Sequence, residues 1–229
     1  MNPTTENRQL KTKLTLALDV DSLKKAKYFV NRLYPKIKIF KVGLQLFTIA
    51  GPDIIKFIQK KGGQVFLDLK FFDIPNTVRN AVRQAVRLKV KMVTLHIQGE
   101  DEMLRAAVKA AKEESRRLNH RRPLLIGVTV LTSQKASSGR VLKLAKLALR
   151  CGLDGVVCSA KEARALRKNI KRNFLIFTPG IRPKGALSHD QERVASAGEA
   201  IEAGSDFLII GRPILEAKDP VLALKQIIS

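Results

Sequence analysis

The sequence has little cysteine, no tryptophan and no long hydrophobic run. Its two cysteines, Cys151 and Cys158, form no CxxC motif and have no further ligand type beside them. We therefore expect two buried free thiols and a reducing, cytoplasmic environment rather than a disulfide or a metal site. No apolar run reaches the roughly 18 residues that a membrane-spanning helix needs, so no membrane span is expected.

Apolar residues are also missing from the N-terminal segment. The first thirteen residues are polar and contain no hydrophobic stretch of the kind found in signal peptides. We expect residues 1–13 to form a flexible tail. Residues 14–229 show no break in composition, and their number suits a single domain with a large core.

Acidic residues are in the minority. Lysine and arginine number 43 against 20 acidic residues, which gives a net charge of +23. A protein with this charge attracts polyanions. However, the basic residues are spread over predicted helix faces, as in residues 83–91, 112–122 and 161–172, and no aromatic stacking motif lies among them. The pattern favours a solvated basic surface over a specific nucleic-acid site, with steering of an anionic substrate as a further possibility.

Eight short apolar runs recur along the chain, and segments with helical periodicity fill most of the gaps. For example, Val78, Val82 and Val86 belong to an i, i+3, i+4 stripe after the third run. Alternating strands and helices predict an α/β protein with parallel pairing, and eight units predict a single-domain (β/α)8 TIM barrel. The expected strands are residues 14–20, 37–43, 64–70, 91–97, 124–131, 155–160, 174–180 and 206–212.

A doubly wound sheet is the alternative architecture. It would more comfortably have five to seven strands and a glycine-rich turn after the first strand. The residues after the first run are DVDSLKKA, without a GxGxxG motif. A Rossmann dinucleotide site is therefore not expected.

Polar residues gather where the predicted strands end. In a parallel barrel these ends form one rim, where active sites are built. A single such residue could be a helix N-cap, but so many together indicate a functional site. They are Asp19, Lys41, Asp68, Lys70, His96, Thr132, Ser159, Thr178, Gly211 and Arg212.

The third run carries the most informative cluster. Asp68 and Lys70 are two residues apart, so on a strand they face the same way. Inward charges are costly unless they are paired, and these two can pair. A structural ion pair at the barrel mouth is the plain alternative, but Asp73 extends the alternation of charge. Pro75 disfavours helix at the preceding residue, and we expect Asn76 or Thr77 to cap the next helix.

The last two strand ends resemble a phosphate grip. TPGIRP (178–183) offers the Gly180 backbone and Arg182, and GRPI (211–214) offers the Gly211 N–H, Arg212 and the start of a short helix. Barrels commonly bind phosphate after strands 7 and 8, and arginine can bind phosphate through two nitrogens. Either arginine alone would suggest a surface residue, but the two together predict a phosphate site.

DLKFFDIPNT, residues 68–77, resembles the DxKxxDIPxT signature of the orotidine 5'-phosphate decarboxylase family. The resemblance covers nearly the whole chain, through LALDV, FKVGLQLF, TLHIQG, VTVLTS, GLDGVVCSA, TPGIRP, DQERV and IIGRPI, and the bacterial form is the most similar. It implies a TIM-barrel carboxy-lyase that converts orotidine 5'-monophosphate to UMP, the last step of de novo pyrimidine synthesis. No metal and no cofactor are implied.

The resemblance also implies roles for individual residues. Lys70 would protonate pyrimidine C6, and Asp68 would lie against the substrate carboxylate. Lys41 and Asp73 would complete an alternating charge network, with Asp73 supplied by the second subunit of a homodimer. No specific nucleic acid and no membrane partner is implied.

The remaining implied contacts are with the substrate. Asp19 and Lys41 would contact the ribose, as would Asp73 and Thr77 from across the interface. Further substrate-binding positions are Ile74 and Pro179, with Thr132 and Ser133 at the pyrimidine and Arg182, Gln191, Gly211 and Arg212 at the phosphate.

Two rival functions remain open. Metal-dependent sugar-phosphate decarboxylases or synthases of the same superfamily share the DxKxxD strand but resemble this chain less, because they use a Glu at the end of the second strand where Lys41 stands here. The second rival is a basic nucleic-acid-binding module without enzymatic activity. Its binding would be weak, independent of sequence and steeply dependent on salt.

Overall fold

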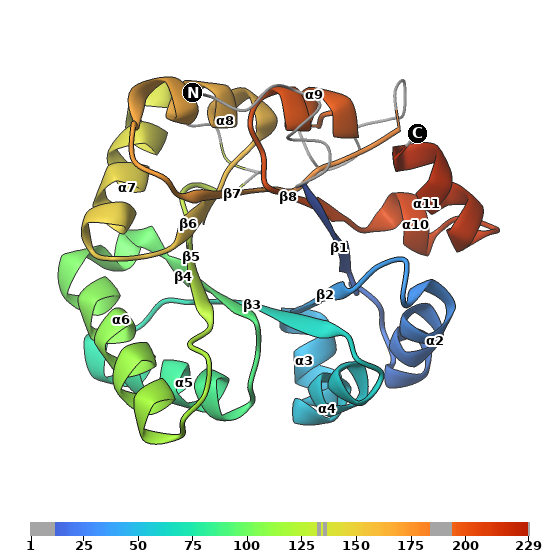
Figure 1. Ribbon diagram of the computed structural model, residues 1–229, viewed down its shortest axis with the longest axis horizontal. Helices are drawn as coiled ribbons and strands as arrows, with labels where there is room; N and C mark the ends of the chain where they lie inside the picture. The colour runs from blue at the N-terminus through green and yellow to red at the C-terminus, as the bar shows by residue number, and fades with distance from the viewer. Residues whose placement is uncertain (1–11, 132–133, 135–136, 184–193, 229) are drawn as a thin grey trace.

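Eight short parallel strands pair in chain order and close into a barrel, because β8 also pairs with β1 (Figure 1). This computed structural model describes residues 12–131, 134, 137–183 and 194–228. Each strand lies inside its predicted run or extends one residue past it, so the predicted barrel is confirmed. The strands are β1 (Lys13–Ala17), β2 (Ile39–Gly43), β3 (Gln64–Phe71), β4 (Met92–His96), β5 (Leu124–Val128), β6 (Gly155–Val157), β7 (Leu175–Thr178) and β8 (Phe207–Ile210).

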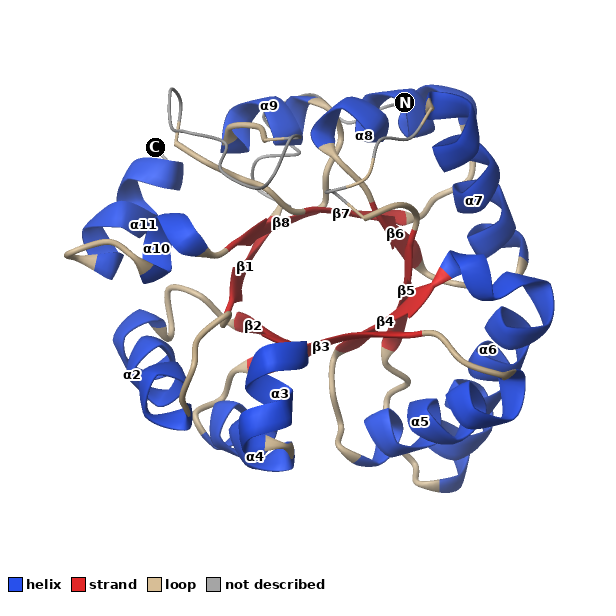
Figure 2. Cartoon of the chain, turned by 180° about the vertical axis from the view of Figure 1, so that it is seen from behind, coloured by secondary structure: helices blue, strands red, loops and turns tan. Residues whose placement is uncertain are grey.

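Helices cover the outside of the barrel (Figure 2). Their apolar faces pack on the outer faces of the strands and form the larger hydrophobic core. They are α2 (Leu23–Leu33), α3 (Leu44–Ala50), α4 (Pro52–Lys60), α5 (Pro75–Arg87), the 3-10 turn η1 (Ile97–Gly99), α6 (Glu100–Arg117), α7 (Ser138–Arg150), α8 (Ala160–Asn169), α9 (Ala197–Glu202), α10 (Arg212–Leu215) and α11 (Pro220–Ile228). No helix in the described residues is long and apolar enough to cross a membrane.

A second, smaller core fills the barrel interior. Phe177 stacks on Phe207 with ring centroids 4.2 Å apart, and Phe66 lies 5.4 Å from Phe177. The other buried members are Ala17, Ile39, Met92, Ile126 and Ile209. Because alternate residues of a strand share a face, the next inward positions on β2 and β3 after Ile39 and Phe66 are Lys41 and Asp68. The apolar plug therefore forms the floor beneath the charged rim.

The end of β3 departs from regular strand geometry. Its register against β4 shifts between Leu67 and Phe71, and Lys70 has a positive φ of 49°. A non-glycine residue seldom adopts this conformation, and such strain is commonly found at functional sites. Here it places a bulge at the residue that we expect to be catalytic.

The start of α5 corrects one prediction. Pro75 is the first helical residue and Ile74 is the N-cap, with no side-chain cap bond. Asn76 and Thr77 therefore lie inside the first turn and do not cap the helix. Proline fits this position because its fixed φ suits a helix start and the N–H it lacks would have no partner there. Of the predicted tail, residues 1–11 lie outside the described residues.

Close packing between β6 and β7 generates a stability prediction. A Cβ atom on Gly155 would lie 2.3 Å from the Leu175 carbonyl oxygen, whereas one on Gly139, in α7, would meet nothing within 4 Å. Gly155→Ala should destabilise the protein by about 1–3 kcal/mol because the neighbouring backbone must shift. Gly139→Ala should be neutral or stabilising by up to about 1 kcal/mol. Urea unfolding curves of the two variants measure both effects, and equal stabilities would contradict this account of the barrel.

Candidate active site

A cavity of about 510 Å³ opens at the C-terminal ends of the strands. Its floor is the apolar plug, represented by Ala17, Phe66 and Ile209. The predicted site residues that line it are Asp19, Lys41, Asp68, Lys70, Pro179, Arg182, Gly211 and Arg212. The structure thus brings together residues from both ends of the sequence in one pocket of the size typical of small-molecule sites.

Four charged side chains alternate in sign on one side of the cavity. The Lys41 Nζ lies 3.0 Å from an Asp19 carboxylate oxygen and 3.2 Å from Asp68 Oδ2. The Lys70 Nζ lies 3.0 Å from the same Asp68 oxygen. Lys41 and Asp68 are almost fully buried, whereas Lys70 and Asp19 reach the open cavity. The array therefore has a fixed buried centre and two accessible ends.

Thr94 on β4 holds the array in place. Its hydroxyl donates to Asp68 Oδ1 at 2.9 Å and accepts from the Lys70 backbone N–H at 2.9 Å. One buried side chain thus fixes both the carboxylate and the bulged backbone that carries Lys70. The sequence analysis missed Thr94; its position two residues before His96, on the same face of the fourth run, was the available signal.

Burial and pairing set the charge states of the central residues. Burial by itself would raise the pKa of Asp68, but the ammonium groups of Lys41 and Lys70 outweigh it and hold that pKa below its usual value. Burial would likewise lower the pKa of Lys41, but Asp68 and Asp19 outweigh it and raise the pKa. Both groups are therefore charged at neutral pH.

The other side of the cavity is suited to an anion. Arg182 is buried, and Gly180 before it has a φ of 76° that favours glycine. Gly211 is the N-cap of α10, and Arg212 is the first residue of that helix. Glu216, at the end of α10, also lines the cavity and was not predicted. No strand-end pattern pointed to it, because it follows the recognisable GRPI segment by two residues.

Several predicted residues lie elsewhere. Asp73, Ile74 and Thr77 are exposed on the loop and first turn after β3 and do not line the cavity. The Asp73 carboxylate accepts a hydrogen bond from the Ile74 N–H at 2.7 Å. The positions predicted at Thr132, Ser133 and Gln191 lie outside the described residues.

Three of the residues predicted at strand ends make contacts within the protein and lie away from the cavity. Ser159 forms a capping box with Glu162 at the start of α8. The Thr178 hydroxyl lies 2.5 Å from that of Ser205 in the protein interior. The His96 ring lies 5.7 Å from that of Phe72, and burial and then Lys70 lower its pKa. None of the three lines the described cavity.

A family model described as the orotidine 5'-phosphate decarboxylase / HUMPS family matches residues 12–227. The chain belongs to this family. In the described residues, no group of three or more His, Cys, Asp or Glu side chains could hold a metal ion.

Relatives within the family match over nearly their full length. An orotidine 5'-phosphate decarboxylase of Syntrophotalea carbinolica is 46% identical, over 96% of this chain and 95% of its own. That of Moorella thermoacetica is 45% identical, over 95% and 91%. The crystal structure of orotidine 5'-phosphate decarboxylase from Lactobacillus acidophilus aligns with a TM-score of 0.82 at 35% identity, over 94% of this chain and 97% of that one.

The Thr94 hydroxyl can be tested against a second buried threonine. Thr94→Val keeps the side-chain shape but leaves Asp68 Oδ1 and the Lys70 N–H without this partner, which should cost about 1–3 kcal/mol of stability. Thr15, on β1, is the matched control, since its buried hydroxyl has no hydrogen-bond partner among the residues that the structure describes. Thr15→Val should be neutral or stabilising. Thermal unfolding of both variants checks this, and an unchanged Thr94→Val melting temperature would contradict the bracing role.

Proposed function

We propose that this protein decarboxylates orotidine 5'-monophosphate to UMP without a metal or an organic cofactor. The observation that carries the proposal is the alternating Asp19–Lys41–Asp68–Lys70 array facing an arginine-lined anion subsite in one cavity. The names of its relatives in the family support the same substrate. A nucleotide fits such a cavity with its base at the array and its phosphate at Arg182 and Arg212.

In the proposed reaction, the bond between C6 and the carboxylate carbon breaks and CO2 leaves. The electron pair stays on C6, and the Lys70 ammonium then gives it a proton. Before that transfer, the fixed positive charge stabilises the developing carbanion, because preorganised charge acts strongly in a water-poor site. The bulge braced by Thr94 holds Lys70 toward the open cavity for this role.

Asp68 would act on the other end of the breaking bond. Its carboxylate is held at the cavity wall by Lys41, Lys70 and Thr94, so it cannot turn away from a substrate carboxylate placed beside it. The repulsion between the two carboxylates would be relieved as CO2 departs. Binding energy from the distant phosphate would offset that repulsion in the bound state.

We further propose a homodimer in which a second copy completes the site. Asp73 and Thr77 are exposed beside the exposed apolar side chains of Phe72 and Ile74. A second copy that covered this apolar surface would bring its own Asp73 and Thr77 to the ribose.

The two cysteines are buried and free, which supports the proposed reducing, cytoplasmic setting.

The main rival is a metal-dependent sugar-phosphate enzyme of the same superfamily. The position in the second strand where those enzymes would use a Glu is occupied by Lys41, whose ammonium is paired with two carboxylates. A bound cation would compete with that ammonium for the same oxygens. The residues of this rim thus favour a metal-free reaction.

Replacing the proposed proton donor tests the function directly. Purified wild-type protein should convert orotidine 5'-monophosphate to UMP, followed by the change in ultraviolet absorbance. Lys70→Ala should lose at least about a thousandfold in kcat, since it removes both the fixed charge and the proton donor. Lys109→Ala, on the exposed face of α6, is the control and should retain full activity.

The outcomes separate function from mechanism. No conversion by the wild type would overturn the proposed function, and full activity of Lys70→Ala would overturn the role of Lys70. EDTA should leave the rate unchanged. A loss of turnover in EDTA that magnesium restores would instead favour the metal-dependent rival.

The phosphate subsite predicts a substrate-dependent effect of Arg212. Arg212→Ala should lower kcat/KM for orotidine 5'-monophosphate about 10- to 100-fold, because a hydrogen bond to a charged group contributes about 1.5–3 kcal/mol. With orotidine, which lacks the phosphate, the same variant should match the wild type within about twofold. An equal loss on both substrates would show that Arg212 does not act through the phosphate. Arg140→Ala, which changes an exposed arginine of α7, controls for charge.

A further inference from the structure

The end of the barrel opposite the active site carries a concentrated positive charge. Because all eight strands are parallel, the segments that lead from a helix into the next strand lie together at this N-terminal end. These segments, with the first residue of β1, contain ten basic residues and only two acidic ones, Asp154 and Asp206. We call the ten the basic face: Lys13, Lys36, Lys38, Lys61, Lys89, Lys91, Arg121, Arg122, Lys171 and Arg172.

This grouping changes the interpretation of the basic runs in the sequence. Residues 83–91, 112–122 and 161–172 were interpreted as helix faces, and most of each run is indeed helical. Each run also passes the C-terminal end of its helix, α5, α6 or α8, and finishes in the segment before the next strand. The last two basic residues of each run therefore lie at this end of the barrel, whereas the earlier ones, such as Arg83 and Lys161, lie on the helices.

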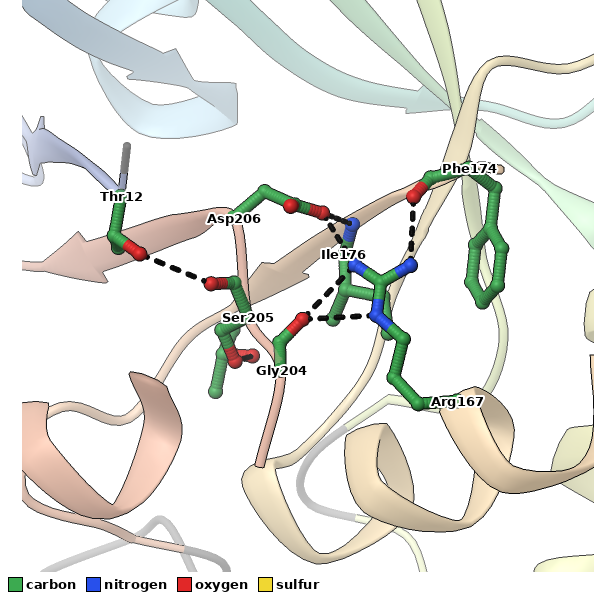
Figure 3. A network of polar contacts seen from close by, with 8 residues as sticks. Thr12, Arg167, Phe174, Ile176, Gly204, Ser205 and Asp206 are labelled. Atoms are coloured by element: carbon green, nitrogen blue, oxygen red, sulfur yellow. Dashed lines mark hydrogen bonds and ion pairs between the residues drawn. The ribbon is translucent and has the colours of Figure 1, made fainter. Parts of the chain in front are cut away.

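The two acidic residues offset little of this charge: Asp154 pairs with one member of the basic face, Arg122, and Asp206 pairs with Arg167, which lies outside it. Asp154 accepts two hydrogen bonds from Arg122, at 2.6 and 2.9 Å. Asp206 lies 2.6 Å from an Arg167 nitrogen and also accepts from the Ile176 N–H at 2.7 Å (Figure 3). Among the described residues, no ion pair involves Lys89, Lys91 or Arg121.

A crevice of about 310 Å³ lies within the basic face, where β3, β4 and β5 begin. It is lined by Lys89, Lys91, His120, Arg121 and Arg122, and no acidic residue lines it. Lys91 is partly buried there, and burial, followed by the nearby charges of Arg121 and Lys13, lowers its pKa. An anion in this crevice would relieve the repulsion among these cations.

A second hollow of about 560 Å³ extends the charged region toward the starts of β6, β7 and β8. Its charged lining residues are Arg167, Lys171 and Arg172, together with Asp154 and Asp206, both of which are paired with arginines. A basic crevice and a second hollow with Lys171 and Arg172 on the same face suit a long polyanion with repeated charges better than one small anion. In double-stranded nucleic acid such charges recur every few ångströms along the helix.

The apolar side chains of the protein point to nucleic acid rather than a lipid surface. The exposed large hydrophobic residues of the described chain are Tyr28, Leu44, Ile49, Phe72, Ile74 and Leu222, and none belongs to the segments of the basic face. Membrane-surface binding usually combines basic residues with apolar side chains that enter the bilayer. The face also presents no exposed aromatic ring for stacking on bases. Contacts would therefore be limited to the phosphate backbone.

We propose that the basic face docks nucleic acid through its phosphodiester backbone, without sequence preference. The active-site cavity opens at the other end of the barrel, so the docked enzyme keeps access to its substrate. The surface is distinct from the catalytic residues, and its test is independent of the proposed reaction.

The test compares two triple variants of equal net charge. Lys89→Glu/Lys91→Glu/Arg121→Glu alters the basic face. Arg140→Glu/Lys143→Glu/Lys161→Glu is the matched control, because these exposed residues lie in the N-terminal halves of α7 and α8, toward the catalytic end. A Gln version of the first triple removes charge without adding acid. Circular dichroism spectra and melting curves establish that each variant folds.

Binding is measured by the fluorescence anisotropy of labelled 20-base-pair RNA and DNA duplexes at several salt concentrations. The wild type should bind both duplexes with about micromolar Kd at low salt. The basic-face variant should bind at least about tenfold more weakly, and its salt slope should fall by about 2 to 3, since roughly 0.9 is expected for each lost phosphate contact. The control variant should lose less than about threefold.

Three results would overturn the proposal. They are no binding by the folded wild type at 50 mM salt, equal losses in the two Glu variants, and tighter binding to phosphatidylserine-containing vesicles than to either duplex. The second would show that net charge alone governs binding, and the third would assign the face to a membrane.

Discussion

The Asp68 carboxylate, held between two ammonium groups and a hydroxyl, is the interaction on which the site depends. A buried carboxylate is costly unless its charge and hydrogen-bonding capacity are satisfied. Its partners come from neighbouring strands, with Lys41 on β2, Lys70 on β3 and Thr94 on β4. They meet only if the three strands are parallel and in the observed register. The pairing of β2 with β3 and of β3 with β4 therefore assembles the centre of the charge array.

This dependence limits how the site can work. The central charges are neutralised by neighbours on rigid strands, so they do not need to rearrange when substrate enters. Lys70 differs from Lys41 because it is partly exposed and sits on a strained bulge. The buried pair provides a fixed potential, while the exposed ammonium can approach a substrate atom. The opposite wall, with Arg182 and Arg212, is separate from this array and can bind a remote group.

Sequence patterns predicted what depends on strand periodicity and missed what depends on neighbouring strands. Because Asp68 and Lys70 are two residues apart in a strand, they were predicted to share one face. The eight apolar runs predicted the barrel. Thr94 was missed because threonine is common in strands, so its presence there indicates no special role until the neighbouring strand is known. The expected cap at Asn76 or Thr77 was wrong because Pro75 starts the helix. The basic residues that end each run could not be placed at one end of the barrel before the helix C-termini were known.

The two ends of the barrel can carry different charge balances because they are far apart for electrostatics. A strand of five residues spans about 17 Å at roughly 3.3 Å per residue. That distance is about twice the Debye length near physiological salt, so exposed charges at one end are largely screened from those at the other. Excess positive charge at the strand starts therefore adds repulsion locally but perturbs Asp68 and Lys41 little. Substitutions in the basic face can consequently change its charge without disturbing the charge array at the catalytic end of the same small domain.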